Sequence, residues 1–114
     1  MSGTRPANPA HSPEMVARLA RERKVEFLWG VLQDILGFGL DREDICEWFE
    51  GFEAHIARHD CFFRKAEATR RYPPGTISDY YQARVDMCRG MIFVKFTIYR
   101  GKLVVTSFKD LDNG

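Results

Sequence analysis

The sequence predicts an α+β domain in which N-terminal helices pack on one face of a C-terminal antiparallel β-sheet. Apolar residues recur at helical spacing through the first half of the chain, and they alternate with polar residues from Ile77 onwards. The 114 residues, of which 45% are hydrophobic and 29% charged, suffice for one domain with a modest core. Residues 13–114 are therefore expected to form a single domain.

The N-terminal stretch MSGTRPANPAHSPE contains no apolar run, so it does not resemble a secretory signal. We expect residues 1–12 to form a flexible leader. No apolar stretch approaches the roughly 18–20 residues that a membrane span needs. Three cysteines cannot all pair within one chain, which favours reduced thiols in a cytoplasmic protein.

Helix signals mark three segments. Ser12 followed by Pro13 is typical of a helix start, and the stripe Val16, Leu19 and Ala20 follows it. A second helix is predicted from Phe27 to Leu36, ended by Gly37 and Gly39. Asp41, with Asp44 three residues on, predicts the start of a third and main core helix that ends near residues 58–60. Its apolar stripe comprises Ile45, Trp48, Phe49, Phe52 and Ile56.

Strand signals fill the second half. Cys61-Phe62-Phe63 predicts a short strand, the double proline in residues 70–75 predicts a loop, and the alternation in residues 77–85 predicts another strand. Arg89-Gly90 is expected to turn the chain into a hairpin that covers residues 91–110. In the strand predicted for residues 77–85, the outward side chains are expected to be Ser78, Tyr80, Gln82 and Arg84.

The hairpin register predicts which side chains share a face. We expect a three-residue loop at 100–102, which pairs residue 97 with 105, 95 with 107 and 93 with 109. A two-residue loop would turn Lys109 toward the core, so we expect the three-residue loop instead. The predicted core face carries Val94, Phe96, Ile98, Val104, Thr106 and Phe108. The predicted outer face carries Phe93, Lys95, Thr97, Tyr99, Ser107 and Lys109, alongside Leu103 and Val105.

The outer face mixes lysine, hydroxyls and aromatic rings. Such a face is commonly only a solvated sheet surface, but rings and cations are also what single-stranded nucleic acid requires for stacking and phosphate contact. Residues 1–58 carry seven Lys/Arg against ten Asp/Glu, and residues 59–114 carry ten against six, so the halves have net charges of −3 and +4. A polyanion is therefore expected to bind the C-terminal half.

Three segments, in order, resemble the motility quorum-sensing regulator (MqsR) family of toxins, which are RelE-like mRNA interferases. The first runs from Met15-Val16-Ala17-Arg18-Leu19 to a short strand at Val25-Glu26-Phe27, and the second is Leu36-Gly37-Phe38-Gly39-Leu40-Asp41. The third comprises Cys61-Phe62-Phe63-Arg64-Lys65, Ser78-Asp79-Tyr80-Tyr81, Phe93-Val94-Lys95-Phe96-Thr97 and Ser107-Phe108-Lys109. The resemblance covers roughly residues 13–110.

The resemblance implies a RelE-like fold and cleavage of mRNA, on or off the ribosome, without metal or cofactor. It also implies a cognate antitoxin as partner. The family's catalytic lysines match Lys109 and either Arg64 or Lys65. Its glutamine is replaced here by Ser78 and its tyrosine by Phe93, a side chain that cannot transfer a proton. Tyr80 and Tyr99 are candidate substitutes, and the expected RNA contacts are Ser78, Gln82, Arg84, Phe93 and Lys95.

Other chemistries have weaker signals. His55 and His59 stand four residues apart beside Asp60 and Cys61, a spacing that can hold a metal, but no second ligand pair follows. No Cys/His/Asp arrangement indicates a thiol enzyme. Arg70-Arg71 is expected to be a solvated loop pair, with RNA or partner contact as the alternative. The main rival to cleavage is a RelE-like domain that binds RNA or protein without catalysis, and a second rival is a pure protein-interaction module.

Overall fold

A five-stranded sheet with the order β1-β5-β4-β3-β2 forms the centre of the computed structural model, which describes residues 8–86, 88 and 90–110. The strands are β1 (Val25–Phe27), β2 (Cys61–Ala68), β3 (Ile77–Arg84), β4 (Met91–Tyr99) and β5 (Lys102–Asp110). The helices are α1 (Pro13–Arg21), α2 (Trp29–Gly37), α3 (Arg42–Glu50) and α4 (Phe52–Ala57).

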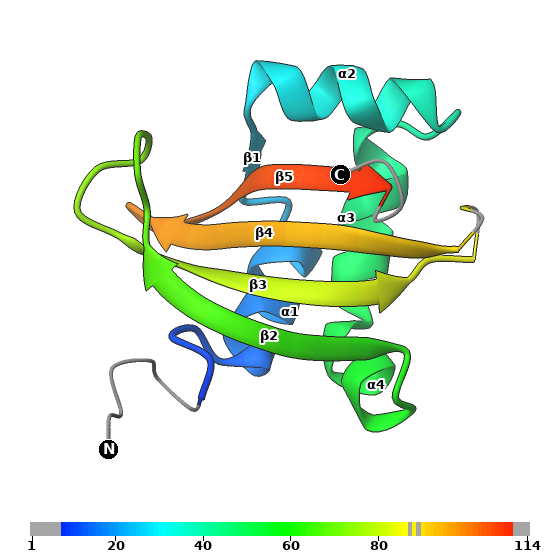
Figure 1. Ribbon diagram of the computed structural model, residues 1–114, viewed down its shortest axis with the longest axis horizontal. Helices are drawn as coiled ribbons and strands as arrows, with labels where there is room; N and C mark the ends of the chain where they lie inside the picture. The colour runs from blue at the N-terminus through cyan, green and yellow to red at the C-terminus, as the bar shows by residue number, and fades with distance from the viewer. Residues whose placement is uncertain (1–7, 87, 89, 111–114) are drawn as a thin grey trace.

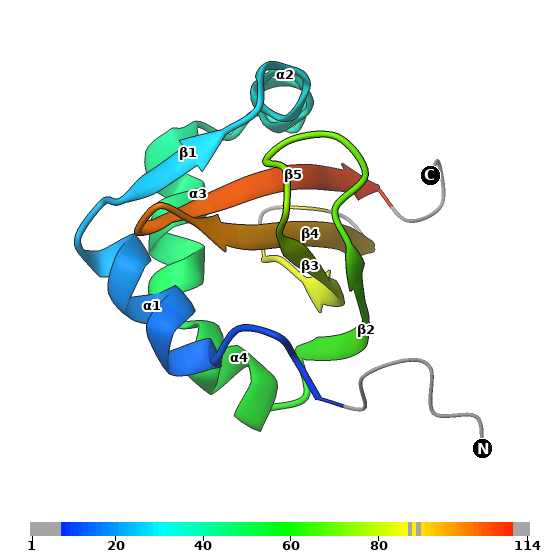
Figure 2. The same ribbon diagram turned by 90° about the vertical axis from the view of Figure 1, so that its left-hand side faces the viewer.

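The helices leave one face of the sheet without a helical cover. Helices α1, α3 and α4 lie behind the sheet in Figure 1, and α2 lies across the edge formed by β1 and β5 (Figures 1 and 2). The predicted α+β class is confirmed. Helices α1, α3 and α4 lie on one face as predicted, whereas α2 lies at the sheet edge (Figures 1 and 2). No helix among residues 8–86, 88 and 90–110 is long and apolar enough to cross a membrane.

The sheet is mixed rather than wholly antiparallel. Strands β2 to β5 pair antiparallel as predicted, but β1 pairs parallel with β5, with Glu26 opposite Val104. The backbone pairing with β5 also includes the residue before β1, because Leu103 N donates to the Lys24 carbonyl at 2.9 Å. A parallel pair requires a long connection, and here the whole of the intervening chain supplies it.

The helix caps act as the sequence predicted. The Ser12 hydroxyl accepts from Met15 N at 3.1 Å at the start of α1. Asp41 and Asp44 form a reciprocal capping box at α3, with both N···O distances at 2.9 Å. Gly39 follows the end of α2 with a φ of +79°, a left-handed conformation that glycine adopts without penalty.

The predicted main helix is divided, so its expected continuity to residues 58–60 is wrong. Gly51 ends α3, donating to the Trp48 carbonyl at 3.2 Å, and α4 begins at the next residue. Glycine has low helix propensity, which makes it a natural point for this break. The apolar stripe still continues on both sides, since Phe49 and Phe52 are each fully buried.

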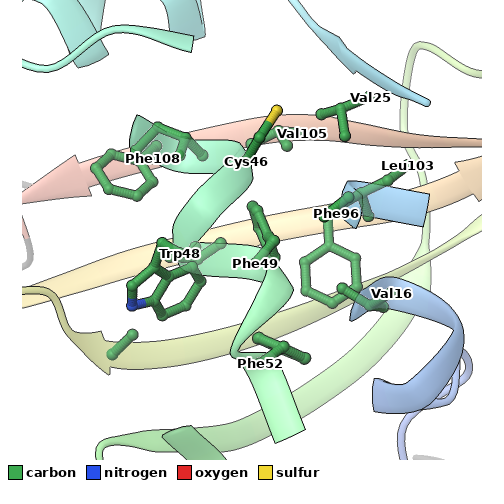
Figure 3. Packing of buried hydrophobic residues seen from close by; sticks show 14 of the residues in the cluster. Val16, Val25, Cys46, Trp48, Phe49, Phe52, Phe96, Leu103, Val105 and Phe108 are labelled. Atoms are coloured by element: carbon green, nitrogen blue, oxygen red, sulfur yellow. The ribbon is translucent and has the colours of Figure 1, made fainter. Parts of the chain in front are cut away.

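Aromatic packing joins the two helices to the sheet. Phe96 of β4 lies 5.6 Å from the ring centres of both Phe49 and Phe52, with edge-to-face geometry (Figure 3). Tyr81 of β3 stacks on Phe96, with ring centres 5.7 Å apart. Such contacts add roughly 0.5–1.5 kcal/mol per pair beyond burial of area, so this group fixes the helices against the sheet.

The β4–β5 hairpin corrects the predicted register near its turn. The loop has two residues, Arg100 and Gly101, with φ of 52° and 76°, so Tyr99 pairs with Lys102. The rejected two-residue loop is therefore the one that forms, and the predicted pairing of residues 97 and 99 with 105 and 103 is wrong.

A β-bulge restores the expected register farther from the turn. Phe96 pairs with Val105 but Lys95 pairs with Ser107, which leaves Thr106 as the extra residue in β5. The predicted pairs 95–107 and 93–109 are therefore correct, and Lys109 stays on the outer face opposite Phe93. Between turn and bulge the predicted faces of β5 are exchanged: Leu103 and Val105 belong to the main hydrophobic cluster, whereas Val104 lies outside that cluster although it is only 1% exposed.

Strand β2 is longer than the predicted Cys61–Phe63 and carries a second bulge. Phe63 pairs with Tyr81 and Lys65 with Tyr80, so Arg64 is the extra residue. The chain continues as a strand to Ala68 before the loop that the double proline predicted. The expected turn residue Arg89 lies outside the described residues, as do residues 1–7 of the expected leader.

Candidate nucleic-acid interface

Two rows of side chains cross the helix-free face of the sheet. The first row runs Lys65, Tyr80, Lys95 and Ser107 from β2 to β5 through successive strand pairs. The second runs Phe62, Gln82, Phe93 and Lys109 through the same strands. Neighbouring members of a row stand roughly 5 Å apart at the backbone, so cations and rings alternate over a short distance.

The two β-bulges create these rows. The bulge at Arg64 puts Lys65, rather than its neighbour, opposite Tyr80. The bulge at Thr106 puts Ser107 opposite Lys95. Bulges that redirect side chains are frequent beside functional sites, and both bulges here act on the same row.

Tyr80 is held between two ammonium groups. Lys65 Nζ lies 4.6 Å and Lys95 Nζ 5.2 Å from the centre of the Tyr80 ring. Phe93 contacts the same ring at 5.6 Å, in a tilted arrangement. Each cation–π contact is worth about 0.5–2 kcal/mol. We call Lys65, Tyr80, Phe93 and Lys95 the basic aromatic cluster.

Lys95 lies at the electrostatic centre of this face. It is half-buried, and burial lowers its pKa, with a further lowering by the positive charges of Arg70, Lys109 and Lys65 that Glu67 partly offsets. A depressed pKa increases the fraction of neutral amine available as a base at a given pH. The same concentration of cations attracts a phosphate.

Glu67 connects the cluster to the adjacent loop. Its carboxylate lies 3.2 Å from Lys65 Nζ, and the Lys65 hydrogen bond is the main cause of its lowered pKa. The pKa of Tyr80 is raised, mainly by burial and then by a hydrogen bond to Glu67. The Tyr80 phenol therefore stays protonated near neutral pH and is a hydrogen-bond donor rather than a base.

The structure separates the expected catalytic residues. Lys65 belongs to the cluster, and Lys109 lies opposite Phe93 and acts on the pKa of Lys95. Arg64 occupies the exposed bulge of the edge strand. Tyr99 is four residues from Lys95, about 13 Å along the strand, and its ring packs 6.0 Å from Tyr72. Tyr80, not Tyr99, is thus the phenol beside the lysines.

The remaining expected RNA contacts differ in accessibility. Gln82 lies beside Phe93 and is half-buried, whereas Arg84 lies at the far end of β3 and is exposed. Ser78 is 1% exposed, and its hydroxyl hydrogen-bonds to that of Thr69 at 2.6 Å. Ser78 therefore supports the base of the β2–β3 loop instead of contacting a ligand directly.

The β2–β3 loop extends beyond the end of β4 (Figure 2) and supplies Arg70 and Tyr72. Thr76 Oγ1 donates to the Pro73 carbonyl at 2.9 Å and also to Thr69 Oγ1 at 2.8 Å, so the loop is internally braced. Arg70 is close enough to lower the pKa of Lys95.

The sequence analysis missed Glu67 and did not place Arg70 beside Lys95. Glu67 was not recognised because β2 was expected to end near Phe63, yet Lys65 and Glu67 are spaced by two, as side chains on one face of a strand are. Arg70 was expected to be a solvated loop residue, with RNA or partner contact as the alternative, because nothing in the local sequence indicates that the loop returns toward Lys95.

Among the described residues, neither a metal site nor an activated thiol is formed. Both His55 nitrogens are engaged, by the Trp48 carbonyl at 2.9 Å and by Arg58 at 3.0 Å. Within the described ranges, no three His, Cys, Asp or Glu side chains are placed to share a metal ion. Burial raises the pKa of all three cysteine thiols, that of Cys61 to about 12, so none is activated as a nucleophile.

Comparison with family models and with curated proteins gave no match to this chain. The function is therefore inferred from the basic aromatic cluster and from the charges around it.

Proposed function

We propose that the helix-free sheet face binds single-stranded RNA and cleaves it without a metal ion, and that the chain is a RelE-like mRNA interferase of the MqsR type. The observation that carries this proposal is the half-buried Lys95 amine, whose pKa is lowered by burial and by three neighbouring cations. Aromatic rings beside it offer stacking surfaces for bases.

The reaction is a transesterification within the RNA. Neutral Lys95 accepts the proton of a 2′-OH, and the 2′-oxygen forms a bond to the adjacent phosphorus. The bond from phosphorus to the 5′-oxygen breaks, which leaves a 2′,3′-cyclic phosphate. Lys109 donates a proton to the departing 5′-oxygen, giving a 5′-OH. The two lysines then exchange a proton with solvent to restore the starting state.

The other residues stabilise the charge that develops at phosphorus. Lys65 and Arg70 are the cations available for the non-bridging oxygens, and arginine can engage two of them at once. Tyr80 contributes its ring, which contacts the ammonium groups of both Lys65 and Lys95. This set uses no histidine, in keeping with a site that concentrates lysine and arginine.

The proposal extends to the cellular role that the family resemblance implies. The substrate is mRNA, on or off the ribosome, and the protein acts in the cytoplasm, where it arrests growth. A cognate antitoxin neutralises it. The three aromatic residues in the two rows, Phe62, Tyr80 and Phe93, give an RNA ligand several places to stack.

The second candidate is RNA binding without cleavage. Phe93 favours it, because a ring without a hydroxyl occupies the centre of the second row. Under this alternative the cations hold phosphate, the rings hold bases, and Lys95 has no catalytic partner.

The test is cleavage of a long RNA by the purified chain in EDTA, with the new ends mapped and their phosphates identified. Lys95→Gln and Lys109→Ala are the site variants, and Lys24→Ala, which removes an exposed lysine after α1, is the matched control. Recurrent cuts with 2′,3′-cyclic phosphate ends, lost in both site variants and kept in the control, support the proposal. Equal cleavage by all four proteins contradicts it.

If the purified chain binds RNA but does not cleave it, and a ribosome-containing reaction also shows no cleavage, the second candidate is favoured. In that case Phe93→Tyr is the decisive variant. A phenol introduced at this position creates cleavage if the site lacks only that group.

A further inference from the structure

A cleft of about 370 Å³ opens beside Lys109, between the C-terminal part of α2 and the end of β5. Its lining residues are Gln33, Asp34, Gly37, Phe38, Lys109 and Asp110. We call it the α2–β5 cleft. Its volume falls at the lower end of the range of about 300–1,000 Å³ that is usual for small-molecule sites.

Lys109 belongs to both the cleft and the RNA face. Its strand position puts it opposite Phe93 in the second row, and its side chain lines the cleft. An RNA whose phosphate is held at Lys109 therefore has the cleft within reach of the attached nucleoside. Helix α2 is fixed beside β5 because Phe38 packs edge-on against Phe108, with ring centres 5.8 Å apart.

The cleft lining suits a base better than a phosphate. Asp34 contributes a carboxylate, which repels a phosphate but accepts hydrogen bonds from the exocyclic amino groups of bases. Gln33 adds an amide that both donates and accepts, and Phe38 adds an aromatic ring. Among the described residues, the Asp34 and Gln33 side chains have no hydrogen-bond or ion-pair partner, so their polar atoms remain available.

We propose that the α2–β5 cleft binds the nucleobase attached to the phosphate at Lys109, and that Asp34 selects bases that carry an exocyclic amino group. Adenine, cytosine and guanine present such a group, and uracil does not. This inference rests on the proposed RNA function of the sheet face, and it adds the residues that set base preference. Asp34 and Gln33 are specificity-determining residues, separate from the lysines that act on the phosphate.

Two variants test the cleft without disturbing the basic aromatic cluster. Asp34→Asn keeps the size of the side chain but replaces one acceptor with a donor. Gly37→Leu adds a side chain at the cleft, where a Cβ meets no atom within 4 Å, and leucine also favours the helix more than glycine. Glu47→Gln, on the exposed side of α3, is the control.

The first measurement is binding of short RNAs that differ in one base and carry a 2′-O-methyl group at the attack position, which prevents cleavage. The parent chain and the control are expected to bind the amino-bearing bases roughly tenfold more tightly than uracil. Asp34→Asn should lose this preference, and Gly37→Leu should weaken binding of all amino-bearing RNAs to the level of the uracil RNA. The second measurement maps cut positions on a long RNA and should show the same change.

Each outcome has one meaning. Binding by the parent with no preference against uracil, or a preference that survives in Asp34→Asn, overturns the role of the cleft and leaves the proposed function intact. The role of the cleft is also overturned if Gly37→Leu has the same melting temperature as the parent chain and still binds amino-bearing bases more tightly than uracil. Absence of RNA binding by the parent overturns the proposed function and this inference together.

Discussion

Tyr80 and Lys95 face each other across β3 and β4, and the Lys95 ammonium lies 5.2 Å from the centre of the Tyr80 ring. Lys65 approaches the same ring at 4.6 Å, so one phenol ring holds two like charges near each other. Burial is the largest cause of the lowered pKa of Lys95, and the positive charges of Arg70, Lys109 and Lys65 lower it further. The ring thus helps to assemble a group of cations that would otherwise separate.

The pKa of Lys95 should shift in opposite directions when the charge of Arg70 or the charge of Glu67 is removed. Arg70→Gln removes a positive charge that lowers this pKa, so the pKa should rise. Glu67→Gln removes a negative charge that raises it, so the pKa should fall. Side-chain NMR titration of Lys95 measures both shifts without any activity assay. The rising limb of the cleavage rate against pH should move with them, and shifts of the same sign would contradict the assigned electrostatics.

Tyr80→Phe and Tyr80→Leu should separate the ring from the hydroxyl. Phenylalanine keeps both cation–π contacts, so RNA affinity should change less than about threefold. Leucine loses them, and at about 0.5–2 kcal/mol for each contact the affinity should fall roughly tenfold. Fluorescence anisotropy with a 2′-O-methyl RNA measures both. Equal loss in the two variants would show that the hydroxyl, rather than the ring, is what RNA binding requires.

RNA binding should depend on salt in proportion to the cations on this face. Lys65, Arg70, Lys95 and Lys109 together predict a slope of about −3 for log K against log salt concentration, at about −0.7 for each contact with a single strand. Lys109→Ala should make the slope shallower by about 0.7, while Lys24→Ala leaves it unchanged. A flat salt dependence in the parent chain would argue for the protein-interaction alternative.

Phe96→Ala should lower the free energy of unfolding by about 3–5 kcal/mol, because it leaves a cavity among packed rings. Phe62→Ala is the matched control, since Phe62 is 43% exposed and the same truncation there should cost well under 1 kcal/mol. Urea unfolding followed by circular dichroism measures both values. A small effect at Phe96 would mean that α3 and α4 do not depend on the sheet for their position.

Asp79 should make stability depend on pH. Its carboxylate is buried and accepts from Ala10 N at 2.8 Å and His11 N at 2.9 Å, yet burial prevails and raises its pKa above the usual 3.8. The folded state therefore holds the proton more tightly than the unfolded state. The stability that Asp79 contributes should fall as pH rises from 3.8 through the folded pKa.

The check is the difference in unfolding free energy between Asp79→Asn and the parent chain. As pH rises from 3.8 through the folded pKa of Asp79, the unfolding free energy of the variant should increase relative to that of the parent. This change is expected whichever of the two proteins is more stable at the acidic end. A shift in favour of the parent would mean that the two backbone N–H groups outweigh burial. Hydrogen exchange at residues 10 and 11 reports in parallel whether the N-terminal segment stays bound to β3.

Local signals were sufficient for most elements. The caps at Ser12 and Asp41, and the alternation in residues 91–99, depend on interactions within a few residues of each other, so the sequence expresses them directly. The break at Gly51 was missed because the apolar stripe continues through it, and a periodic pattern alone does not report a change of axis.

The β4–β5 hairpin shows where pattern and geometry diverge. A strict period of two made the two-residue turn look incompatible with an outward Lys109, since a slip of one residue exchanges the faces. The bulge at Thr106 supplies the missing residue and returns Lys109 to the outer face. A bulge is stabilised by its neighbouring strands and leaves little trace in the sequence of its own strand.

The sequence by itself determined the two-layer organisation and the lysines and rings of the outer face, because these follow from periodicity and residue type. Tertiary structure alone decided that Lys65 rather than Arg64 reaches Tyr80, that β1 adds to the sheet in parallel, and that Arg70 and α2 lie near the ends of the site. These relationships join residues distant in the chain. They depend on strand register, loop path and packing, which act only once the whole domain has folded.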